Sequence, residues 1–353
     1  MYIMLSSCKK YVQFLCSLHV KNISNSTHHC FPLKSESPMN VFDRKAKSKQ
    51  KERAGGMPDV EVYDYLKSEI GFRLSDRVLD VKRTFKCALD LGCSRGYVSK
   101  HIIADSVEKL IMCDTSPTYL SQASPPEEGV IVERLVVDEE NLPFESDSLD
   151  LVISNLSLHW VNDLPGTFSQ IMRILKNDGV FMASVFGGDS LFELRCSLQL
   201  AELERVGGLS PHISPFTSVQ DIGNLLTRSG FTMLTIDTDE IVVGYPSMFE
   251  LMWDLKGMGE SNAARNRSLH LSRDKMLAAA AIYQEMYGQE DKIPATFQVL
   301  YMVGWKPDPS QPKPAERGSG QVSLKDLYRL DEVVKDIKQM PLEDINPDKD
   351  KNK

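Results

Sequence analysis

The sequence lacks a run of apolar residues long enough to cross a membrane as a helix, which needs about 20 residues. The nearest approaches, residues 180–186 and 277–283, are far shorter. An excess of basic residues is also missing, because the formal net charge is −8. This charge argues against a nucleic-acid binder whose affinity comes from neutralising phosphates. We therefore expect neither a transmembrane span nor a nucleic-acid partner.

Paired cysteines are missing as well. The seven cysteines form no Cys-x-x-Cys motif, and three of them lie before residue 31. This pattern offers neither the framework of a disulfide-rich secreted domain nor a zinc site, so we expect a reducing compartment and no metal ligands. With 42% hydrophobic and 25% charged residues, the 353-residue chain has enough apolar material for one large or two modest domains.

The first 35 residues contain no Asp or Glu, but they carry lysines and many serines between apolar residues. This composition is typical of a mitochondrial transit peptide, although the segment also lacks arginine. A disordered start without a targeting role is the alternative. We interpret residues 1–37 as a transit peptide and residues 38–80 as a helical lead-in to the fold.

From residue 86 onward, short apolar runs alternate with longer amphipathic ones. Such alternation predicts βαβ units, right-handed crossovers and a mostly parallel sheet over residues 81–306. The predicted strands are residues 87–91, 110–113, 130–137, 149–154, 180–185, 231–236 and 296–305.

Two helical insertions interrupt this pattern, at about residues 189–216 and 246–290, and we expect them to cover the mouth of a substrate site. Thr217 and Gln220 predict a capping box for the helix after the first insertion. Residues 307–353 begin with several prolines and end in a charged run, which predicts a largely disordered tail.

The segment Ala88-Leu-Asp-Leu-Gly-Cys-Ser-Arg-Gly-Tyr97 places a buried strand before a glycine-containing loop. Glycines let backbone N–H groups approach a ligand closely at the start of the next helix. The spacing Asp90-x-Gly92-x-Ser94-x-Gly96 resembles motif I of the class I S-adenosylmethionine (SAM) methyltransferases. The resemblance implies a Rossmann-like, seven-stranded α/β sheet with helices on both faces, and an acid at position 90 that faces the amino group of SAM.

Other acids follow the next strands in order. Asp114 ends the second predicted strand, from which a carboxylate accepts the ribose hydroxyls. Asp138 and Glu139 resemble the family's adenine-edge loop, and residues 148–155 resemble its fourth strand. Taken alone, Asp114 is equally consistent with a helix N-cap and Asp138 with a turn. The expected SAM-binding residues are Asp90, Gly92, Ser94, Gly96, Asp114, Asp138, Glu139 and Asn155.

The stretch Ser154-Asn-Leu-Ser-Leu-His-Trp-Val-Asn-Asp-Leu-Pro165 narrows the resemblance to BioC-like methyltransferases. Residues 186–202, 210–217 and 257–262 are similar to a subfamily of mitochondrial complex I assembly factors described as arginine hydroxylases. The resemblance implies hydroxylation of an arginine in the complex I iron–sulfur subunit, early in assembly, together with other assembly factors. It implies a peripheral position on the matrix side of the inner membrane.

The oxygen-activating cofactor stays open. An iron site of the common two-histidine, one-carboxylate type would favour His-x-Asp/Glu, which none of the seven histidines begins. A methyltransferase acting on a protein or small molecule and a non-catalytic chaperone are the alternative functions.

Residues that contact substrate are expected above the carboxyl ends of the strands. His159 and Trp160 follow the fourth strand, Asp189 follows the fifth, and Glu260 lies in the second insertion. Asp189 and Glu260 suit an arginine, because carboxylates accept paired N–H groups from a guanidinium. The alternatives are that Trp160 packs on the sheet, His159 is a polar rim residue, Asp189 is an N-cap and Glu260 is a solvated acid.

Overall fold

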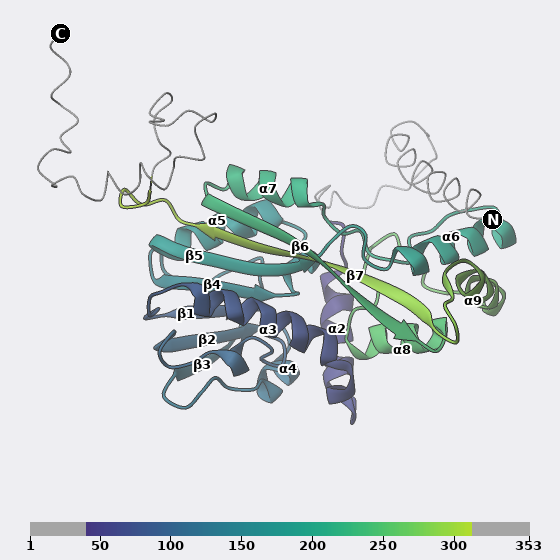
Figure 1. Ribbon diagram of the computed structural model, residues 1–353, viewed down its shortest axis with the longest axis horizontal. Helices are drawn as coiled ribbons and strands as arrows, with labels where there is room; N and C mark the ends of the chain where they lie inside the picture. Colours follow the sequence, from purple (N-terminus) through teal and green to yellow (C-terminus); the bar gives the residue numbers. More distant parts are fainter. Residues whose placement is uncertain (1–39, 313–353) are drawn as a thin grey trace, which may run out of the picture. The chain divides into compact units, whose positions relative to one another are not determined.

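The computed structural model describes residues 40–312 (Figure 1). The described chain belongs to one compact unit as far as Asp308, and a second unit begins at Pro309. The predicted transit peptide and most of the predicted tail, from residue 313, lie outside the described residues.

Seven strands form one sheet in the order β3-β2-β1-β4-β5-β7-β6. The first five pair in parallel, and β7 is antiparallel to both of its neighbours. The strands are β1 (Ala88–Leu91), β2 (Lys109–Asp114), β3 (Ile131–Val136), β4 (Leu149–Asn155), β5 (Leu175–Phe186), β6 (Thr232–Tyr245) and β7 (Ile293–Trp305). This topology confirms the predicted seven-stranded α/β fold of the class I methyltransferases.

Eight α-helices accompany the sheet within residues 40–312. They are α2 (Arg44–Gly55), α3 (Tyr65–Asp80), α4 (Pro117–Gln122), α5 (Leu164–Ile174), α6 (Phe192–Val206), α7 (Val219–Arg228), α8 (Met248–Gly257) and α9 (Arg273–Tyr287). Three short 3-10 helices are η1 (Val60–Tyr63), η2 (Ser99–His101) and η3 (Leu158–Trp160).

Both faces of the sheet are covered, because successive residues of a strand point to opposite sides. In β1, Ala88 packs in a cluster with residues of α3, whereas Leu89 packs in a second cluster with residues of α5 and α7. All four residues of β1 are therefore buried, as expected for a central parallel strand.

The insertions lie around the ends of the last two strands. Helices α6, α8 and α9 gather beside β6 and β7, and α2 stands at one end of β1 to β5 (Figure 1). Strand β6 continues to Tyr245, beyond the predicted end at residue 236. Its second half is only partly buried, so exposed acids such as Glu240 are tolerated there and mask the strand in the sequence.

The N-terminus of α7 also differs from the prediction by one residue. Ser218, rather than Thr217, is the N-cap, and its side chain accepts a hydrogen bond from the backbone N–H of Asp221. A threonine followed by a serine gives two adjacent candidates for the same role, because both hydroxyls can accept from a free N–H.

Candidate functional site

The ends of the parallel strands bring the predicted cofactor residues to one edge of the sheet. The loop after β1 begins at Gly92, β2 ends at Asp114, β4 ends at Asn155, and Asp138 follows β3. This is the edge at which open α/β sheets bind ligands.

The loop after β1 has a left-handed backbone at three of these residues. Gly92, Ser94 and Gly96 have φ angles of 71°, 50° and 77°. A Cβ on Gly92 would lie 2.2 Å from the Ser157 hydroxyl oxygen, and one on Gly96 would lie 2.5 Å from the Ser124 carbonyl oxygen. Glycine is therefore required at positions 92 and 96. Ser94 keeps its side chain at a cost of about 1 kcal/mol in backbone strain.

Asp90 is buried beneath this loop. One of its carboxylate oxygens accepts a hydrogen bond of 2.7 Å from the Ser99 hydroxyl, and the other, Oδ1, has no partner within residues 40–312. Burial and, to a smaller extent, the charge of Asp114 raise the pKa of Asp90, and the Ser99 hydrogen bond lowers it. The net pKa is about 7. An unpartnered buried oxygen at a strand end is a candidate acceptor for a ligand.

Asp114 is buried and fixed from two sides. It accepts the backbone N–H of Ser94 at 3.0 Å and that of Ser116 at 2.8 Å. It is not the N-cap of α4, because the Ser116 side chain has that role. The N-cap alternative for Asp114 is therefore wrong.

The loop after β3 holds one exposed and one buried acid. Asp138 is half exposed and forms a turn through the backbone N–H of Glu140. Glu139 is buried and accepts a hydrogen bond of 2.7 Å from the Ser157 hydroxyl. Although burial raises its pKa, Lys51 and Arg44 together lower it to about 2, so Glu139 is ionised at neutral pH.

Asn155 is turned toward the protein. Its amide nitrogen donates to the Lys67 carbonyl at 3.1 Å, and its amide oxygen accepts from the Ser184 hydroxyl at 2.8 Å. These bonds join β4 to α3 and β5.

Helix α2 supplies cations to this edge that the sequence analysis missed. Lys51 Nζ lies 3.3 Å from Asp114 Oδ1 and 3.7 Å from Glu139 Oε1. Arg44 Nη2 donates to Asp138 Oδ1 at 2.6 Å and also to Glu139. The available signal was the spacing of Arg44, Lys47 and Lys51, which places the three side chains on one face of a helix.

The structure brings three of the four predicted catalytic residues together. Glu260 Oε2 accepts a hydrogen bond of 2.8 Å from Trp160 Nε1 and lies 3.3 Å from His159 Nε2. Lys67 Nζ lies 2.6 Å from Glu260 Oε1, and Lys47 Nζ lies 3.5 Å from Oε2. Burial raises the pKa of Glu260, but the positive charges of Lys47 and Lys67 hold it well below its usual range, while burial lowers the pKa of Lys47 well below its own ordinary value. Glu260 is therefore a buried ionised acid and not a solvated one.

His159 is 6% exposed, so the rim alternative is wrong. Burial lowers its pKa, and its Nδ1 atom has no partner among the described residues. The ring centroid lies 5.0 Å from that of Phe186 and 5.9 Å from that of Phe216. Trp160 packs against Phe42, with ring centroids 5.4 Å apart.

Asp189 lies apart from these three residues. It is exposed, and its carboxylate accepts a hydrogen bond of 3.2 Å from the Gln298 amide. Helix α6 begins after Leu191, so Asp189 is not its N-cap and that alternative is wrong.

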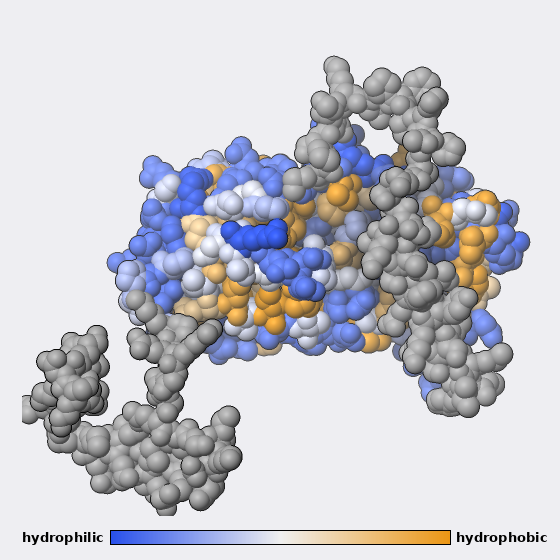
Figure 2. All heavy atoms as spheres, turned by 90° about the horizontal axis from the view of Figure 1, so that it is seen from above, coloured by the Kyte–Doolittle hydropathy of each residue, from blue (hydrophilic) through white to orange (hydrophobic). Residues whose placement is uncertain are grey.

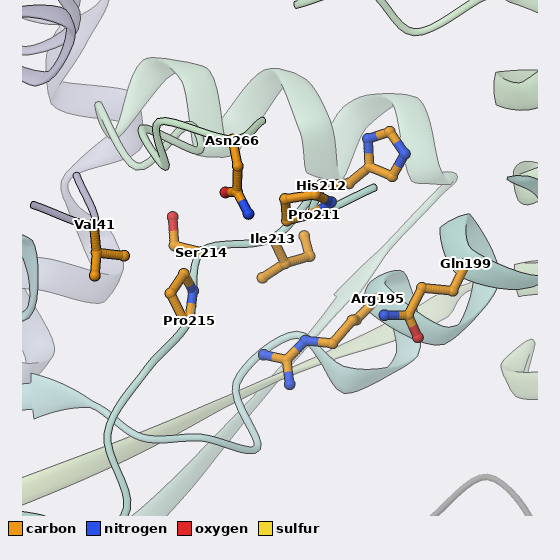
Figure 3. A pocket seen from close by; sticks show the side chains of 9 residues that line it. All are labelled: Val41, Arg195, Gln199, Pro211, His212, Ile213, Ser214, Pro215 and Asn266. Atoms are coloured by element: carbon orange, nitrogen blue, oxygen red, sulfur yellow. The ribbon is translucent and has the colours of Figure 1, made fainter. Parts of the chain in front are cut away.

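A cavity of about 330 Å³ lies between α6 and the loop of residues 211–215 (Figure 3). Arg195 and Gln199 of α6 line it from one side and Asn266 from another. Phe216, which follows the loop, contacts the ring of His159, so the loop connects this cavity wall to the His159 cluster.

Within residues 40–312, no three His, Cys, Asp or Glu side chains are grouped so as to hold a metal ion. No helix in the same range combines the length and the apolar character that a membrane span requires.

The sheet order and the glycine-containing loop define a methyltransferase-type domain, and residues 89–183 match the family model for a methyltransferase domain. The chain is 52% identical to "Arginine-hydroxylase NDUFAF5, mitochondrial" of Danio rerio, over 91% of this chain and 99% of that protein. It is 54% identical to the Homo sapiens protein of the same name, over 86% and 88% of the two chains. A malonyl-[acyl-carrier protein] O-methyltransferase of Methylovorus sp. (strain MP688) is 31% identical, over 76% and 90%. The chain belongs to the NDUFAF5 arginine-hydroxylase family, which confirms the resemblance found in the sequence.

Proposed function

We propose that this chain hydroxylates an arginine of the iron–sulfur subunit of respiratory complex I, and that it acts early in assembly with other complex I assembly factors. The observation that carries the proposal is the 52% identity to a relative named arginine-hydroxylase over 99% of that relative's length. We place the reaction in the mitochondrion, on the matrix side of the inner membrane, after removal of residues 1–37.

The charges at the strand ends support an arginine substrate. Asp138 and Glu139 together bind the guanidinium of Arg44, which also donates to the Trp160 carbonyl at 3.3 Å. Both acids accept from the same nitrogen, Nη2, so this edge binds a guanidinium by charge and not through the paired fork of two nitrogens. His159, Trp160, Glu260 and Asp189 remain the candidates for substrate contact.

We propose SAM as the cofactor, held by the predicted residues at the strand ends other than Asn155, whose amide group is bonded to Lys67 and Ser184. The unpartnered Asp90 oxygen fits its amino group, and the loop of residues 92–96, which lies above Asp90, is the part of the site proposed for its methionine part. Asp114 and Asp138 fit the sugar and the base, although cations of α2 contact both acids here. Bound SAM supplies an electrophilic methyl group, or serves as a structural ligand if the hydroxylation uses another oxygen-activating group.

A peripheral contact with the inner membrane would use exposed apolar side chains. Leu200, Leu203 and Val206 recur at a spacing of three along α6, and each is exposed. Figure 2 shows hydrophobic patches among hydrophilic side chains on one face of the molecule. We propose such surfaces for docking to the membrane or to assembly partners.

Mass spectrometry of the iron–sulfur subunit tests the function. Cells that lack this chain are complemented with the parent, with His159→Gln or with His270→Gln, an exposed histidine as the control. We expect the parent and His270→Gln to add one oxygen atom to an arginine of the subunit and His159→Gln to add less, at equal chain abundance.

Other masses would support the alternative functions. A methylene group gained with the parent would indicate methyl transfer instead, as in the Methylovorus relative. An unmodified subunit that nevertheless fails to assemble without the chain would indicate a non-catalytic chaperone.

A further inference from the structure

Helix α2 has two sets of basic residues with opposite environments. Arg44, Lys47 and Lys51 are spaced three and four residues apart, face the sheet and are partly or fully buried, whereas Lys45 and Lys49 are exposed. The inner set is a basic stripe (Arg44, Lys47 and Lys51), in which Arg44 and Lys51 contact the acids at the strand ends and Lys47 contacts Glu260.

Two residues of the basic stripe contact the acids that the proposed cofactor needs. Lys51 Nζ lies 3.3 and 3.4 Å from the two carboxylate oxygens of Asp114, from which the ribose hydroxyls would be held. Arg44 donates to Asp138, the proposed partner of the adenine amine. The helix therefore supplies N–H donors where the cofactor would supply its own O–H and N–H donors.

A buried lysine such as Lys51 is an unusual way to attach a helix to the edge of a sheet. Removing an ammonium group from water costs several kcal/mol, which must be offset by close anions, whereas an apolar side chain would avoid that cost. Asp114 and Glu139 provide the anions. Both acids are inside the proposed cofactor site, so the attachment of the helix and the occupation of the site depend on the same carboxylates.

Space for a rearrangement lies beside the stripe. A cavity of about 310 Å³ is lined by Arg44, Lys47 and Lys51 on the helix and by Thr115 and Asp138 on the ends of the strands. The cavity therefore lies between the basic stripe and Asp138, which is the part of the site proposed for the adenine.

We propose that the basic stripe occupies the adenosine half of the cofactor site in the free protein, so that SAM must eject Lys51 and Arg44 before it binds. The inference rests on the SAM-binding part of the proposed function. The free chain is then a self-occupied state, and the apparent affinity for SAM is reduced by the fraction of molecules in that state. Ejection removes two of the contacts that hold α2, so SAM also loosens this helix.

Calorimetry with SAM tests the competition. Lys51→Met keeps most of the side-chain stem but removes the charge, and Lys49→Met is the control on the exposed side of the same helix. We expect Lys51→Met to bind SAM more tightly than the parent, by about tenfold if nine in ten molecules are self-occupied, and Lys49→Met to match the parent. Adenosine should show the same order of affinities, and free methionine should not distinguish the chains.

Hydrogen exchange of the parent chain provides a test that needs no variant. Amide exchange in residues 44–55 should rise when SAM is added, while exchange in the loop of residues 92–98 should fall. Slower exchange in residues 44–55 would overturn the inference, because SAM would then hold the helix in place.

The two proposals fail in different ways. If the parent binds SAM and Lys51→Met binds it equally or more weakly, Lys51 is a bystander or a cofactor ligand and only the inference is rejected. If neither the parent nor Lys51→Met binds SAM, the SAM part of the proposed function is rejected together with the inference.

Discussion

Asp90 retains its proton to a higher pH than most carboxyl groups. Burial and the charge of Asp114 raise its pKa, the hydrogen bond from Ser99 lowers it, and the net pKa is about 7. The pKa is about 3.9 in an unfolded chain. The folded state therefore binds more protons than the unfolded state between these values. The contribution of Asp90 to stability falls as the pH rises through this window and is lowest above about pH 7.

Asp90→Asn should remove this dependence, because an amide can accept the Ser99 hydrogen bond and has no charge to bury. Relative to the parent, we expect the variant to gain free energy of unfolding as the pH rises from about 4 to about 7, by at most about 4 kcal/mol. Urea unfolding across this range measures the difference, with Asp105→Asn at an exposed site as the control. A parent–variant difference that stays constant with pH would contradict the raised pKa.

Ser94 is a non-glycine residue in a left-handed turn, with φ of 50°. Ser94→Gly should relieve about 1 kcal/mol of strain, partly offset by the greater freedom of glycine in the unfolded chain. We expect unchanged or slightly higher stability and SAM affinity no lower than that of the parent. Ser121→Gly, in the exposed part of α4, should instead lose up to about 1 kcal/mol. A large loss of SAM affinity in Ser94→Gly would show that the hydroxyl binds the cofactor.

Helix α3 approaches the loop after β1 so closely that its contact point must be glycine. A Cβ on Gly71 would lie 2.7 Å from the Tyr97 carbonyl oxygen, and the backbone there cannot yield as a flexible side chain would. In α7, by contrast, a Cβ on Gly223 would meet only the tip of Ile236 at 3.5 Å. Both glycines lie inside a helix, so they differ only in the atoms that surround them.

Gly71→Ala should therefore destabilise the fold by about 1 to 3 kcal/mol through overpacking. Gly223→Ala should stabilise it by about 0.5 to 1 kcal/mol, because alanine loses less conformational freedom in a helix. Thermal unfolding of both variants and the parent measures the contrast. Equal effects of the two substitutions would mean that α3 can shift away from Tyr97.

The elements that the sequence predicted well are those defined by local apolar runs. Five of the predicted strands start within about one residue of the observed strands, because short apolar runs mark them in the sequence, and the seventh starts three residues earlier than predicted, at Ile293. The fifth strand starts earlier, at Leu175, and the sixth ends later, at Tyr245. Both extra stretches are partly exposed, so their polar residues hide them from an analysis of apolar runs.

The sequence did not predict where α2 lies. The prediction was only that residues 38–80 form a helical lead-in, and charged residues are rarely buried unless they are paired. The role of the basic stripe is evident only in the folded chain, where Asp114 at the end of β2 and Glu139 after β3 lie next to Arg44 and Lys51. Long-range pairing of charges leaves no local signal, whereas the motif around Asp90 and Gly92 is contiguous and was found.

Glu260 links distant parts of the chain. It contacts Lys47 of α2, Lys67 of α3, and His159 and Trp160 of η3. The two lysines are separated from it by about 200 residues in the sequence, at 213 and 193 positions. The buried acid thus joins the N-terminal helices to the segment between α8 and α9 of the second insertion, and its charge is compensated only in the complete fold.

Glu260→Gln should consequently weaken the whole molecule. It leaves the buried Lys67 ammonium group without its anion and removes the charge that opposes the lowering of the Lys47 pKa by burial, and loss of one partner of a buried pair costs about 3 to 5 kcal/mol. Glu133→Gln, at the exposed pair with Lys109, is the control and should change the free energy of unfolding little. Urea unfolding at neutral pH measures both variants.

The pH dependence of the stability difference between the parent and Glu260→Gln distinguishes an effect of charge from an effect of side-chain shape. The pKa of Glu260 is held well below 4.5 in the folded state, so its stabilising effect is full above about pH 4.5 and is lost as the pH falls toward the folded pKa. The difference between the parent and Glu260→Gln should therefore shrink in acid. Adding Lys67→Met to Glu260→Gln should recover part of the loss, because one of the two unpaired cations is removed. No recovery in the double variant would mean that Glu260 acts through its hydrogen bonds to Trp160 and His159 and not through the lysines.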